Sequence, residues 1–262
     1  MPEGDTIRYA ANRMCPVLEG RVLTLENVTK RFGGLTAVRA VSLDVREREL
    51  VGIIGPNGAG KTTLFNVVSG YYRPEEGRVV FAGSDVTGRA PHDICRLGLT
   101  RTFQIVKPFG NLSVLDNVMI GALTRTPTVR AARSDAERVV ETCGLAPYAT
   151  ARARALPIAL RKRLEVARAL ATRPRVLLLD EVMAGLNPTE LGGMVDLIRR
   201  LHAEGLTVIV IEHIMAAMMR LAQRIVVLHH GEKIAEGTPA QIVADRRVVD
   251  AYLGEEFVLA QA

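Results

Sequence analysis

Hydrophobic residues follow two patterns along the chain, one alternating and one continuous. Val41, Leu43 and Val45 alternate with polar residues, which predicts a strand with one solvent-facing side. A continuous apolar run follows at residues 50–54, and three further predominantly apolar runs lie at residues 176–179, 206–211 and 224–228. Such runs are typical of strands buried on both faces of a sheet. A helix predicted over residues 189–203 separates two of them, and this alternation predicts an α/β fold with a parallel sheet.

The pattern changes between residues 105 and 172, where helix follows helix and no strand is predicted. We interpret this stretch as a helical subdomain inserted into the sheet domain. C-terminal helices are expected over about 238–255, the last of them over 247–253. Residues 1–21 form an extension of uncertain role, so the main domain is expected to occupy residues 22–262.

The composition is that of a globular protein: of 262 residues, 48% are hydrophobic and 24% charged, which excludes a mainly disordered chain. Aromatic residues make up only 4%, so a stacking platform for single-stranded nucleic acid is not expected. The scattered cysteines, Cys15, Cys95 and Cys143, argue against a disulfide framework or a structural zinc site and favour a reducing cytoplasm. Residues 206–219 are interrupted by Glu212 and a histidine, so no membrane span is expected.

Basic residues are concentrated in one part of the chain. The net charge is +6, but residues 125–175 hold 12 basic and 4 acidic residues. These basic residues could bind phosphates, an anionic membrane surface or an acidic partner, or they could form a solvated face. The pattern leaves these alternatives open.

A phosphate-binding motif follows the first continuous run. The motif matches G-x-x-x-x-G-K-[ST] between a buried strand and a helix, and its residues are Gly55, Pro56, Asn57, Gly58, Ala59, Gly60, Lys61, Thr62 and Thr63. The glycines let the backbone wrap closely, so that N–H groups point at the β and γ phosphates of a nucleotide. Lys61 adds a positive charge and Thr62 an oxygen ligand for Mg²⁺. The alternative is a glycine-rich turn that matches by chance.

Acidic residues follow another of the buried runs. Asp180 and Glu181 come after residues 176–179, at the carboxyl end of a parallel strand, where ligands of open α/β sheets bind. Asp180 is expected to hold Mg²⁺, and Glu181 to polarise a water for in-line attack on the γ-phosphate. The alternative is that both acids cap the next helix. After residues 206–211, His213 is expected to contact the γ-phosphate or the attacking water, although a lone histidine is more often structural.

Together these motifs resemble the ATPase subunit of an ABC transporter over about residues 22–262. The resemblance implies a P-loop NTPase of the ABC type with a mixed or parallel sheet core, an antiparallel β subdomain and an inserted helical subdomain. It assigns Phe32 to stacking on adenine, although this ring could be a surface aromatic. It assigns Gln104 to the loop that senses Mg²⁺ and the membrane partner. Three residues match the D-loop, with Asn where many relatives have Asp: Leu186, Asn187 and Pro188.

Three segments resemble the branched-chain amino acid importer branch of this family: residues 184–188, 231–239 and 249–255. Lipopolysaccharide-export ATPases share parts of the same pattern. The resemblance implies ATP and Mg²⁺ as ligands, membrane permease subunits, a second ATPase subunit or a second copy of this chain, and a periplasmic or extracellular solute-binding protein. It also implies a peripheral position at the cytoplasmic face of the cell membrane, and nucleic acid is not an expected partner.

The chain departs from the family at the signature L-S-G-G-Q, where it has Leu156, Pro157, Ile158, Ala159 and Leu160. In the family, the serine hydroxyl and glycine N–H groups contact the γ-phosphate of the opposite subunit, and Pro157 supplies neither donor. Ile158 and Ala159 add Cβ atoms where glycine allows close approach, and Leu160 replaces an amide. Pro157 still suits the first position of a helix, so the positive helix end should remain aimed at the opposing nucleotide. We therefore expect an asymmetric pair in which a partner ATPase offers an intact signature to this chain's catalytic residues.

Other functions stay as alternatives. Residues 1–22 resemble the N-terminus of formamidopyrimidine and endonuclease-VIII-type DNA glycosylases, in which Pro2 would be the nucleophile and Glu3 would assist it. The body and cysteine zinc finger of that family have no counterpart, so an active glycosylase is not expected. The remaining alternatives are a non-transport ABC protein and a subunit whose ATP only holds a dimer together. The intact Glu181 and His213 weigh against the second.

Overall fold

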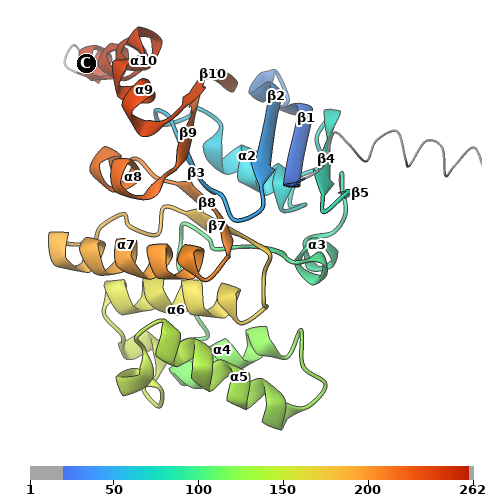
Figure 1. Ribbon diagram of the computed structural model, residues 1–262, viewed down its shortest axis with the longest axis vertical. Coiled ribbons are helices and arrows are strands. Elements are labelled where there is room, and N and C mark those ends of the chain that lie inside the picture. The colour runs from blue at the N-terminus through green and yellow to red at the C-terminus, as the bar shows by residue number, and fades with distance from the viewer. Residues whose placement is uncertain (1–19, 260–262) are drawn as a thin grey trace, which may run out of the picture.

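A six-stranded sheet forms the centre of the computed structural model, which describes residues 20–259 (Figure 1). Its order is β10-β9-β3-β8-β7-β6; the strands from β9 to β6 are parallel, and β10 is antiparallel to β9. The strands are β3 (Leu50–Ile54), β6 (Leu99–Arg101), β7 (Val176–Asp180), β8 (Thr207–Ile211), β9 (Arg224–His229) and β10 (Glu232–Gly237). Every residue of β3, β7 and β8 is buried, which confirms the prediction from the continuous apolar runs.

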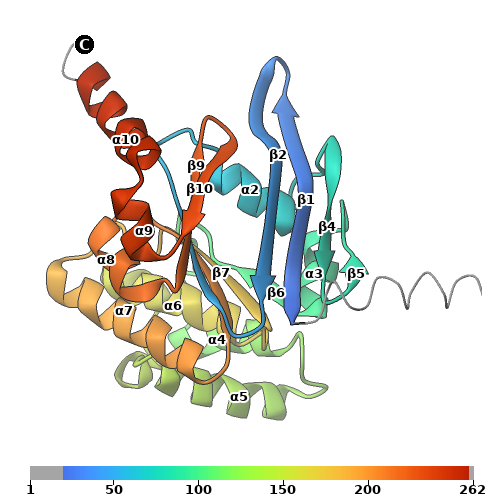
Figure 2. The same cartoon turned by 45° about the horizontal axis from the view of Figure 1, so that its top comes forward.

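A second sheet is antiparallel and has the order β2-β1-β4-β5. Its strands are β1 (Arg21–Phe32), β2 (Leu35–Arg46), β4 (Glu76–Phe81) and β5 (Ser84–Asp85). In β2, Val41, Leu43 and Val45 are buried and the residues between them are more exposed, as the alternation predicts. Helix α2 (Lys61–Val68) lies between the two sheets (Figure 2), because its Leu64 and Phe65 share one buried cluster with strands of both.

The helical subdomain lies at one end of the molecule (Figure 1). It comprises α4 (Val114–Ala122), α5 (Val129–Thr142), the 3-10 turns η2 (Ala146–Tyr148) and η3 (Ala153–Ala155), and α6 (Ile158–Leu170). Residues 105–172 are all described and form no strand, as predicted, apart from an isolated bridge between Ser113 and Arg152. Helix α6 joins the subdomain to the central sheet, since Leu164 shares one buried cluster with Leu177 of β7.

The remaining helices are α3 (Pro91–Leu97), α7 (Pro188–Ala203), α8 (Met215–Leu221), α9 (Pro239–Ala244) and α10 (Arg246–Leu259). The last helix is longer than predicted, since it continues to Leu259 rather than ending near residue 253. The hydrophobic pattern also misses β6, which has three residues, and β10, an edge strand in which only Ala235 is buried. Within the described residues, no helix has the length and apolar character that crossing a membrane requires.

Asn117 fixes the loop that leads into the helical subdomain. Its buried side chain accepts the N–H of Phe109 (2.9 Å) and donates to the carbonyl oxygens of Phe109 (3.1 Å) and Ser113 (2.8 Å). Alanine would leave the N–H of Phe109 without its partner and remove the two side-chain hydrogen bonds to carbonyl oxygens that also accept main-chain N–H groups. We therefore expect Asn117→Ala to lower the free energy of unfolding by about 2–3 kcal/mol in urea titrations. Asn111→Ala, an exposed position in the same loop, should change it by less than about 0.5 kcal/mol. Equal small effects at both positions would contradict this role.

Candidate nucleotide-binding and hydrolysis site

The motif at residues 55–63 forms a tight turn between β3 and α2. Gly60 has a φ of 97°, and a Cβ atom there would lie 2.2 Å from the carbonyl oxygen of Ala37. A Cβ atom at Gly55 would lie 2.1 Å from the carbonyl oxygen of Leu228. Both positions require glycine because the turn packs between β2 and β9. No described side chain caps α2, so the N–H groups of its first turn can donate to a phosphate.

Lys61 begins α2 and its side chain lies within this turn. The residue is buried, and its Nζ atom donates to the carbonyl oxygens of Gly55 (2.6 Å) and Pro56 (2.7 Å). Burial raises the pKa of Asp180, and the charge of the Lys61 ammonium group is one of those that oppose the shift. The structure therefore brings the lysine of the phosphate-binding motif to the predicted metal-binding carboxylate.

A cavity of about 690 Å³ opens beside the turn, a size that suits a small-molecule ligand. It is lined by the motif residues from Asn57 to Thr63 and by Phe32, Gln104 and Glu181. Gly55 and Pro56 lie behind this surface and contact Lys61 instead. Phe32 packs edge-on against Tyr72, with ring centroids 5.1 Å apart, and this contact fixes the ring beside the cavity.

Asp180 is the last residue of β7 and is only 1% exposed. Its Oδ2 atom accepts a hydrogen bond from the guanidinium group of Arg101 at 2.9 Å. Its Oδ1 atom has no hydrogen-bond partner among the residues that the structure describes. Burial raises the pKa of Asp180, and the positive charges of Arg101 and Lys61 oppose the shift. A buried carboxylate oxygen of this kind is suited to a ligand from outside the chain.

Magnesium fits this carboxylate. Asp180, Thr62 and Gln104, the three predicted metal-site residues, line one hollow of about 480 Å³. Mg²⁺ in nucleotide sites is held by one or two carboxylates together with phosphate oxygens rather than by a complete protein cage. Across residues 20–259, no group of three or more His, Cys, Asp or Glu side chains could hold a metal. The donors present therefore suit a metal that binds together with a nucleotide.

Glu181 adopts a left-handed backbone conformation, with a φ of 49°. Such a conformation costs a non-glycine residue about 1–3 kcal/mol and persists where the surroundings impose it. The Glu181 N–H donates to the carbonyl oxygen of Ile211 (3.0 Å), and its Oε2 atom accepts from Nε2 of Gln104 (2.7 Å). The turn thus directs the Glu181 carboxylate toward Gln104 and the cavity.

Two buried charged residues beside Glu181 were not predicted from the sequence. Lys162 of α6 donates to the carbonyl oxygen of Glu181 at 2.8 Å. Glu212, fully buried after β8, accepts the N–H of Met183 at 2.7 Å. Burial raises the pKa of Glu212 to about 7, and the Met183 hydrogen bond and the charge of Lys162 oppose the shift. The local sequence pattern does not assign either residue to the site. Lys162 belongs to a run of basic residues, and Glu212 interrupts an apolar run without matching a motif.

Arg101 is a further site residue that the sequence analysis does not single out. Its side chain is 7% exposed, donates to Asp180, and stacks on the ring of Phe103, 4.7 Å from the centroid. It directly precedes the loop that carries Gln104, and this proximity to a predicted site residue was the available signal. The positive charge of Arg101 opposes the burial that raises the pKa of Asp180.

His213 is exposed and does not line the cavity, so its contact with the γ-phosphate stays a prediction. A different histidine, His230, lines the cavity together with Arg39. His230 lies in the turn between β9 and β10, where the N–H of Gly231 donates to the carbonyl oxygen of Ala59 at 3.1 Å. This hydrogen bond attaches the turn to the phosphate loop. In the sequence, the only feature that could have indicated His230 as a site residue is a His-His-Gly turn.

The signature positions surround the start of α6, but the helix begins one residue later than predicted. Pro157 is extended, with a ψ of 160°, and Ile158 is the first helical residue. Leu156 is buried in the core, whereas Ile158 is 51% exposed. Within the described residues, no side chain caps this end of α6. The helix therefore presents an exposed apolar residue at its N-terminus.

The D-loop position Asn187 caps helix α7. Its side chain accepts the N–H of Glu190 (3.0 Å), and the Glu190 carboxylate accepts the N–H of Asn187 (3.0 Å). Asn and Asp are equivalent at such a cap. Asn187, followed by Pro188, therefore preserves the start of α7, and Leu186 packs against the core.

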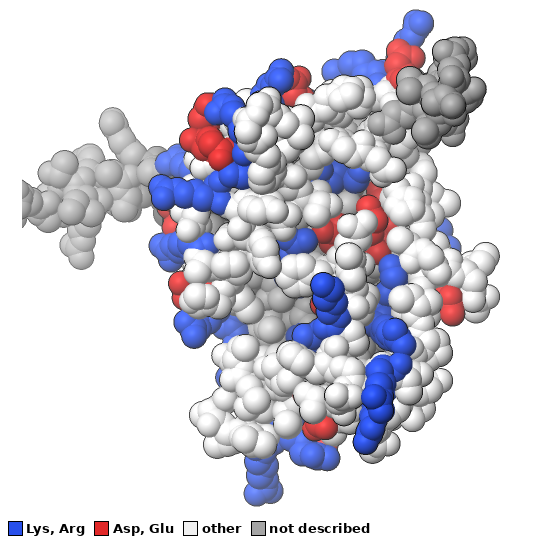
Figure 3. Space-filling model, turned by 180° about the vertical axis from the view of Figure 1, so that it is seen from behind, with Lys and Arg blue, Asp and Glu red and all other residues white. Residues whose placement is uncertain are grey.

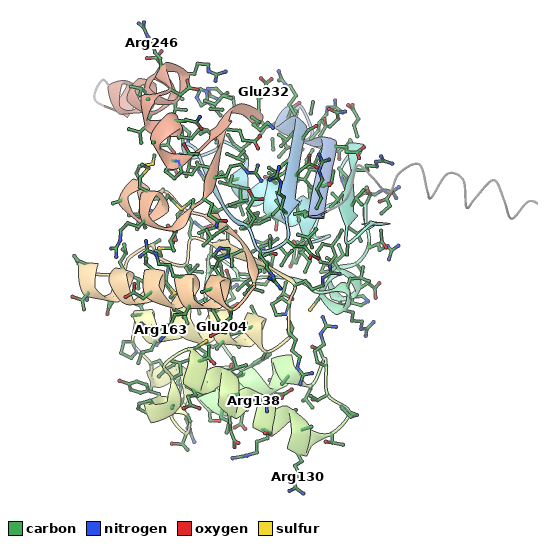
Figure 4. All side chains as sticks on the ribbon, in the orientation of Figure 1. Arg130, Arg138, Arg163, Glu204, Glu232 and Arg246 are labelled. Atoms are coloured by element: carbon green, nitrogen blue, oxygen red, sulfur yellow. The ribbon has the colours of Figure 1, made fainter. Side chains whose placement is uncertain are left out.

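Part of the basic excess of residues 125–175 has a structural role. Arg125 donates to the carbonyl oxygens of Cys95, Arg96 and Thr172, and Arg163 donates to that of Cys143. Other cations face outward: Arg130, at the outer part of α5, points away from the molecule (Figure 4), and Lys and Arg side chains are frequent over the lower half of the face in Figure 3. Only some of the basic residues at 125–175 therefore form a solvated surface, and the others bond within the chain.

This geometry defines a class, the P-loop nucleotide-binding proteins with an inserted helical subdomain. A family model described as ABC transporter matches residues 38–184, and one described as branched-chain amino acid ATP-binding cassette transporter matches residues 232–258. The chain belongs to the ATP-binding cassettes of ABC transporters, which are ATPases coupled to transport.

The relatives extend over most of the chain. It is 40% identical over 250 residues to the high-affinity branched-chain amino acid transport ATP-binding protein BraF of Pseudomonas aeruginosa, covering 89% of this chain and 98% of that protein. LivG of Escherichia coli, with the same description, is 38% identical with the same coverage. An ATP-binding cassette of an ABC transporter in its ADP conformation has a TM-score of 0.82 at 31% identity, covering 89% of this chain and 99% of that chain. A dimeric post-hydrolysis cassette bound to ADP and Pi has a TM-score of 0.75 at 25% identity, covering 83% and 98%.

These likenesses confirm the fold and the family predicted from the motifs. They give no support to the glycosylase-like interpretation of residues 1–22, most of which lie outside the described residues.

The raised pKa of Glu212 predicts a pH-dependent stability. A carboxyl group whose pKa is about 7 in the folded chain and 4.5 ordinarily binds protons more tightly when folded, so its contribution to stability falls as the pH rises between these values and is level above them. We expect this loss to be at most about 3 kcal/mol. Urea unfolding at about pH 5 and about pH 8 should show Glu212→Gln gaining stability relative to wild type at the higher pH. If the difference in free energy of unfolding between Glu212→Gln and wild type is the same at both pH values, the raised pKa of Glu212 is contradicted.

Proposed function

We propose that this chain is the ATP-hydrolysing subunit of an importer for branched-chain or similar hydrophobic amino acids. The observation that carries the proposal is the placement of Lys61 and Glu181 in the lining of one cavity, with Asp180 in the lining of a second hollow that shares Thr62 and Gln104 with the first. The match of residues 232–258 to the branched-chain amino acid family model supports the substrate class. BraF and LivG, which carry that transport in their names, support it further.

Each site residue has a distinct part in the proposed mechanism. Lys61 and the N-terminus of α2 bind the phosphates, while Thr62, Gln104 and Asp180 would hold Mg²⁺, which would neutralise phosphate charge. Glu181 takes the proton of the attacking water, and Gln104 holds the Glu181 carboxylate toward the cavity. Phe32 stacks on adenine, and His213 contacts the γ-phosphate or the attacking water.

The proposed assembly is a pair of ATPase chains that close head to tail over two ATP molecules. The dimeric cassette bound to ADP and Pi is a precedent for such a pair. Permease subunits dock near Gln104, at the cytoplasmic face of the membrane, and a solute-binding protein delivers the amino acid. Because Pro157 and the exposed Ile158 provide few donors to an opposing nucleotide, a partner ATPase with an intact signature is favoured over a second copy.

Hydrolysis at this site is tested in the complete transporter, reconstituted in liposomes with labelled leucine. Lys61→Ala should abolish nucleotide binding and uptake, because the phosphates lose their counter-charge. Glu181→Gln should keep Mg-ATP binding and lower the hydrolysis rate by roughly 100-fold. The control is Glu204→Gln, an acid at the end of α7 and away from the cavity (Figure 4).

The outcomes separate the alternatives. Undiminished hydrolysis in Glu181→Gln would exclude this site as the working one. Wild-type hydrolysis without leucine uptake would favour another solute or a non-transport role. Mg-ATP binding without hydrolysis in wild type would favour a subunit whose ATP only holds the pair together.

Restoring the signature tests the asymmetry. The combined variant Pro157→Ser, Ile158→Gly, Ala159→Gly and Leu160→Gln returns the missing donors, and we expect the ATPase rate of the purified chain alone to rise by roughly 100-fold. Titration with Mg-ATP should show unchanged binding, because the phosphate loop is untouched. No increase in rate, with folding intact, would mean that the depleted signature does not limit the homodimer.

A further inference from the structure

Lys162 lies in a buried position one turn into α6. The residue is 6% exposed, and its Nζ atom donates to the carbonyl oxygen of Glu181 at 2.8 Å. Lysine is rarely this buried unless its charge is compensated. Burial lowers the pKa of Lys162, and the negative charges of Glu212 and Glu181 oppose the shift.

The contact falls on the part of Glu181 that determines where its carboxylate points. Glu181 is in the left-handed region, and its N–H is held by the carbonyl oxygen of Ile211 (3.0 Å). Lys162 holds the carbonyl oxygen on the other side of the same residue. With both main-chain groups bonded, the residue cannot rotate away from this conformation without losing a buried hydrogen bond.

Glu212 completes the arrangement from the end of β8. It is 0% exposed, and its Oε1 atom accepts the N–H of Met183, two residues after Glu181. The segment from Glu181 to Met183 is thus held by the Lys162 side chain of α6 at one end and by the Glu212 side chain, just after β8, at the other.

We propose that Lys162 is a positioning residue whose ammonium group holds the Glu181 backbone in the conformation that directs the catalytic carboxylate into the nucleotide cavity. The proposal rests on the function proposed above, in which Glu181 takes the proton of the attacking water. It adds a link inside one chain: the helix that begins at the signature position Ile158 also holds this chain's own Glu181. A displacement of α6 at its N-terminus is therefore transmitted to the carboxylate by one hydrogen bond.

The kinetic test uses the complete transporter. Lys162→Met keeps the length of the side chain and removes the ammonium group, so we expect kcat for ATP to fall about tenfold or more while KM changes less than about twofold. Lys162→Arg, which can still donate to the Glu181 carbonyl, should restore kcat to within about threefold of wild type. If Lys162→Met does not fold, Lys162→Gln takes its place.

Arg163→Met is the matched control. Arg163 is the next residue of α6 and also donates to a main-chain carbonyl, that of Cys143 (3.3 Å). Its substitution removes a comparable hydrogen bond from the neighbouring position of α6, and among the described residues Arg163 makes no hydrogen bond to Glu181. We expect kcat and KM of this variant to stay within about twofold of wild type.

Hydrogen exchange of the full chain gives a second measure that does not depend on hydrolysis. Lys162→Met should speed exchange of the amides of Glu181 and Met183, and Arg163→Met should not. Two results would overturn the proposal. One is a wild-type kcat in Lys162→Met. The other is a change in both kcat and KM, accompanied by faster exchange throughout the chain. A wild-type transporter without hydrolysis would refute the proposed function instead, and the exchange measurement would then decide alone whether Lys162 holds Glu181.

Discussion

Parallel pairing of β3, β8 and β7 is the constraint on which the site depends. The three strands lie side by side and run in the same direction, so the phosphate loop after β3 and the acids after β7 leave the sheet at one edge. The register pairs Asp180 with Ile211. A slip of one residue would turn the Asp180 side chain to the opposite face of the sheet, away from Lys61. The ladder therefore determines the chemistry as well as the architecture.

The same burial that fixes the register makes charged groups at this edge costly, and each has at least one local hydrogen-bond partner, although Oδ1 of Asp180 and Oε2 of Glu212 have none among the described residues. Lys61 bonds to two loop carbonyls, Asp180 to Arg101, Lys162 to the Glu181 carbonyl and Glu212 to the Met183 N–H. Such a network is stable only when nearly every group has a partner. A polyanion that binds here meets groups already in place, so little reorganisation is needed during the reaction.

The sequence predicts the parts of this arrangement that depend on local pattern. Continuous apolar runs identified the central strands, and the motif at residues 55–63 with Asp180 and Glu181 located the site. Arg101, Lys162 and Glu212 could not be found in this way, because each acts through a partner that only tertiary packing brings near. The short strands β6 and β10 were not predicted either. β6 is too short to show a hydrophobic period, and β10 is an edge strand with only one buried residue.

Helix α6 shows how a depleted signature can coexist with an intact hydrolysis site in one chain. Residues 158 and 162 are four apart, so Lys162 lies about one turn further along the helix than Ile158. Its first turn, with Ile158 exposed, faces the partner's nucleotide in the proposed pair, whereas Lys162 and Leu164 face this chain's own Glu181 and core. Loss of donors at residues 157–160 weakens what the chain offers its partner but leaves the hydrogen bond to Glu181 and the packing of α6 unchanged. The asymmetry proposed above rests on this division, because in the proposed pair the two ends of the same turn belong to two different nucleotide sites.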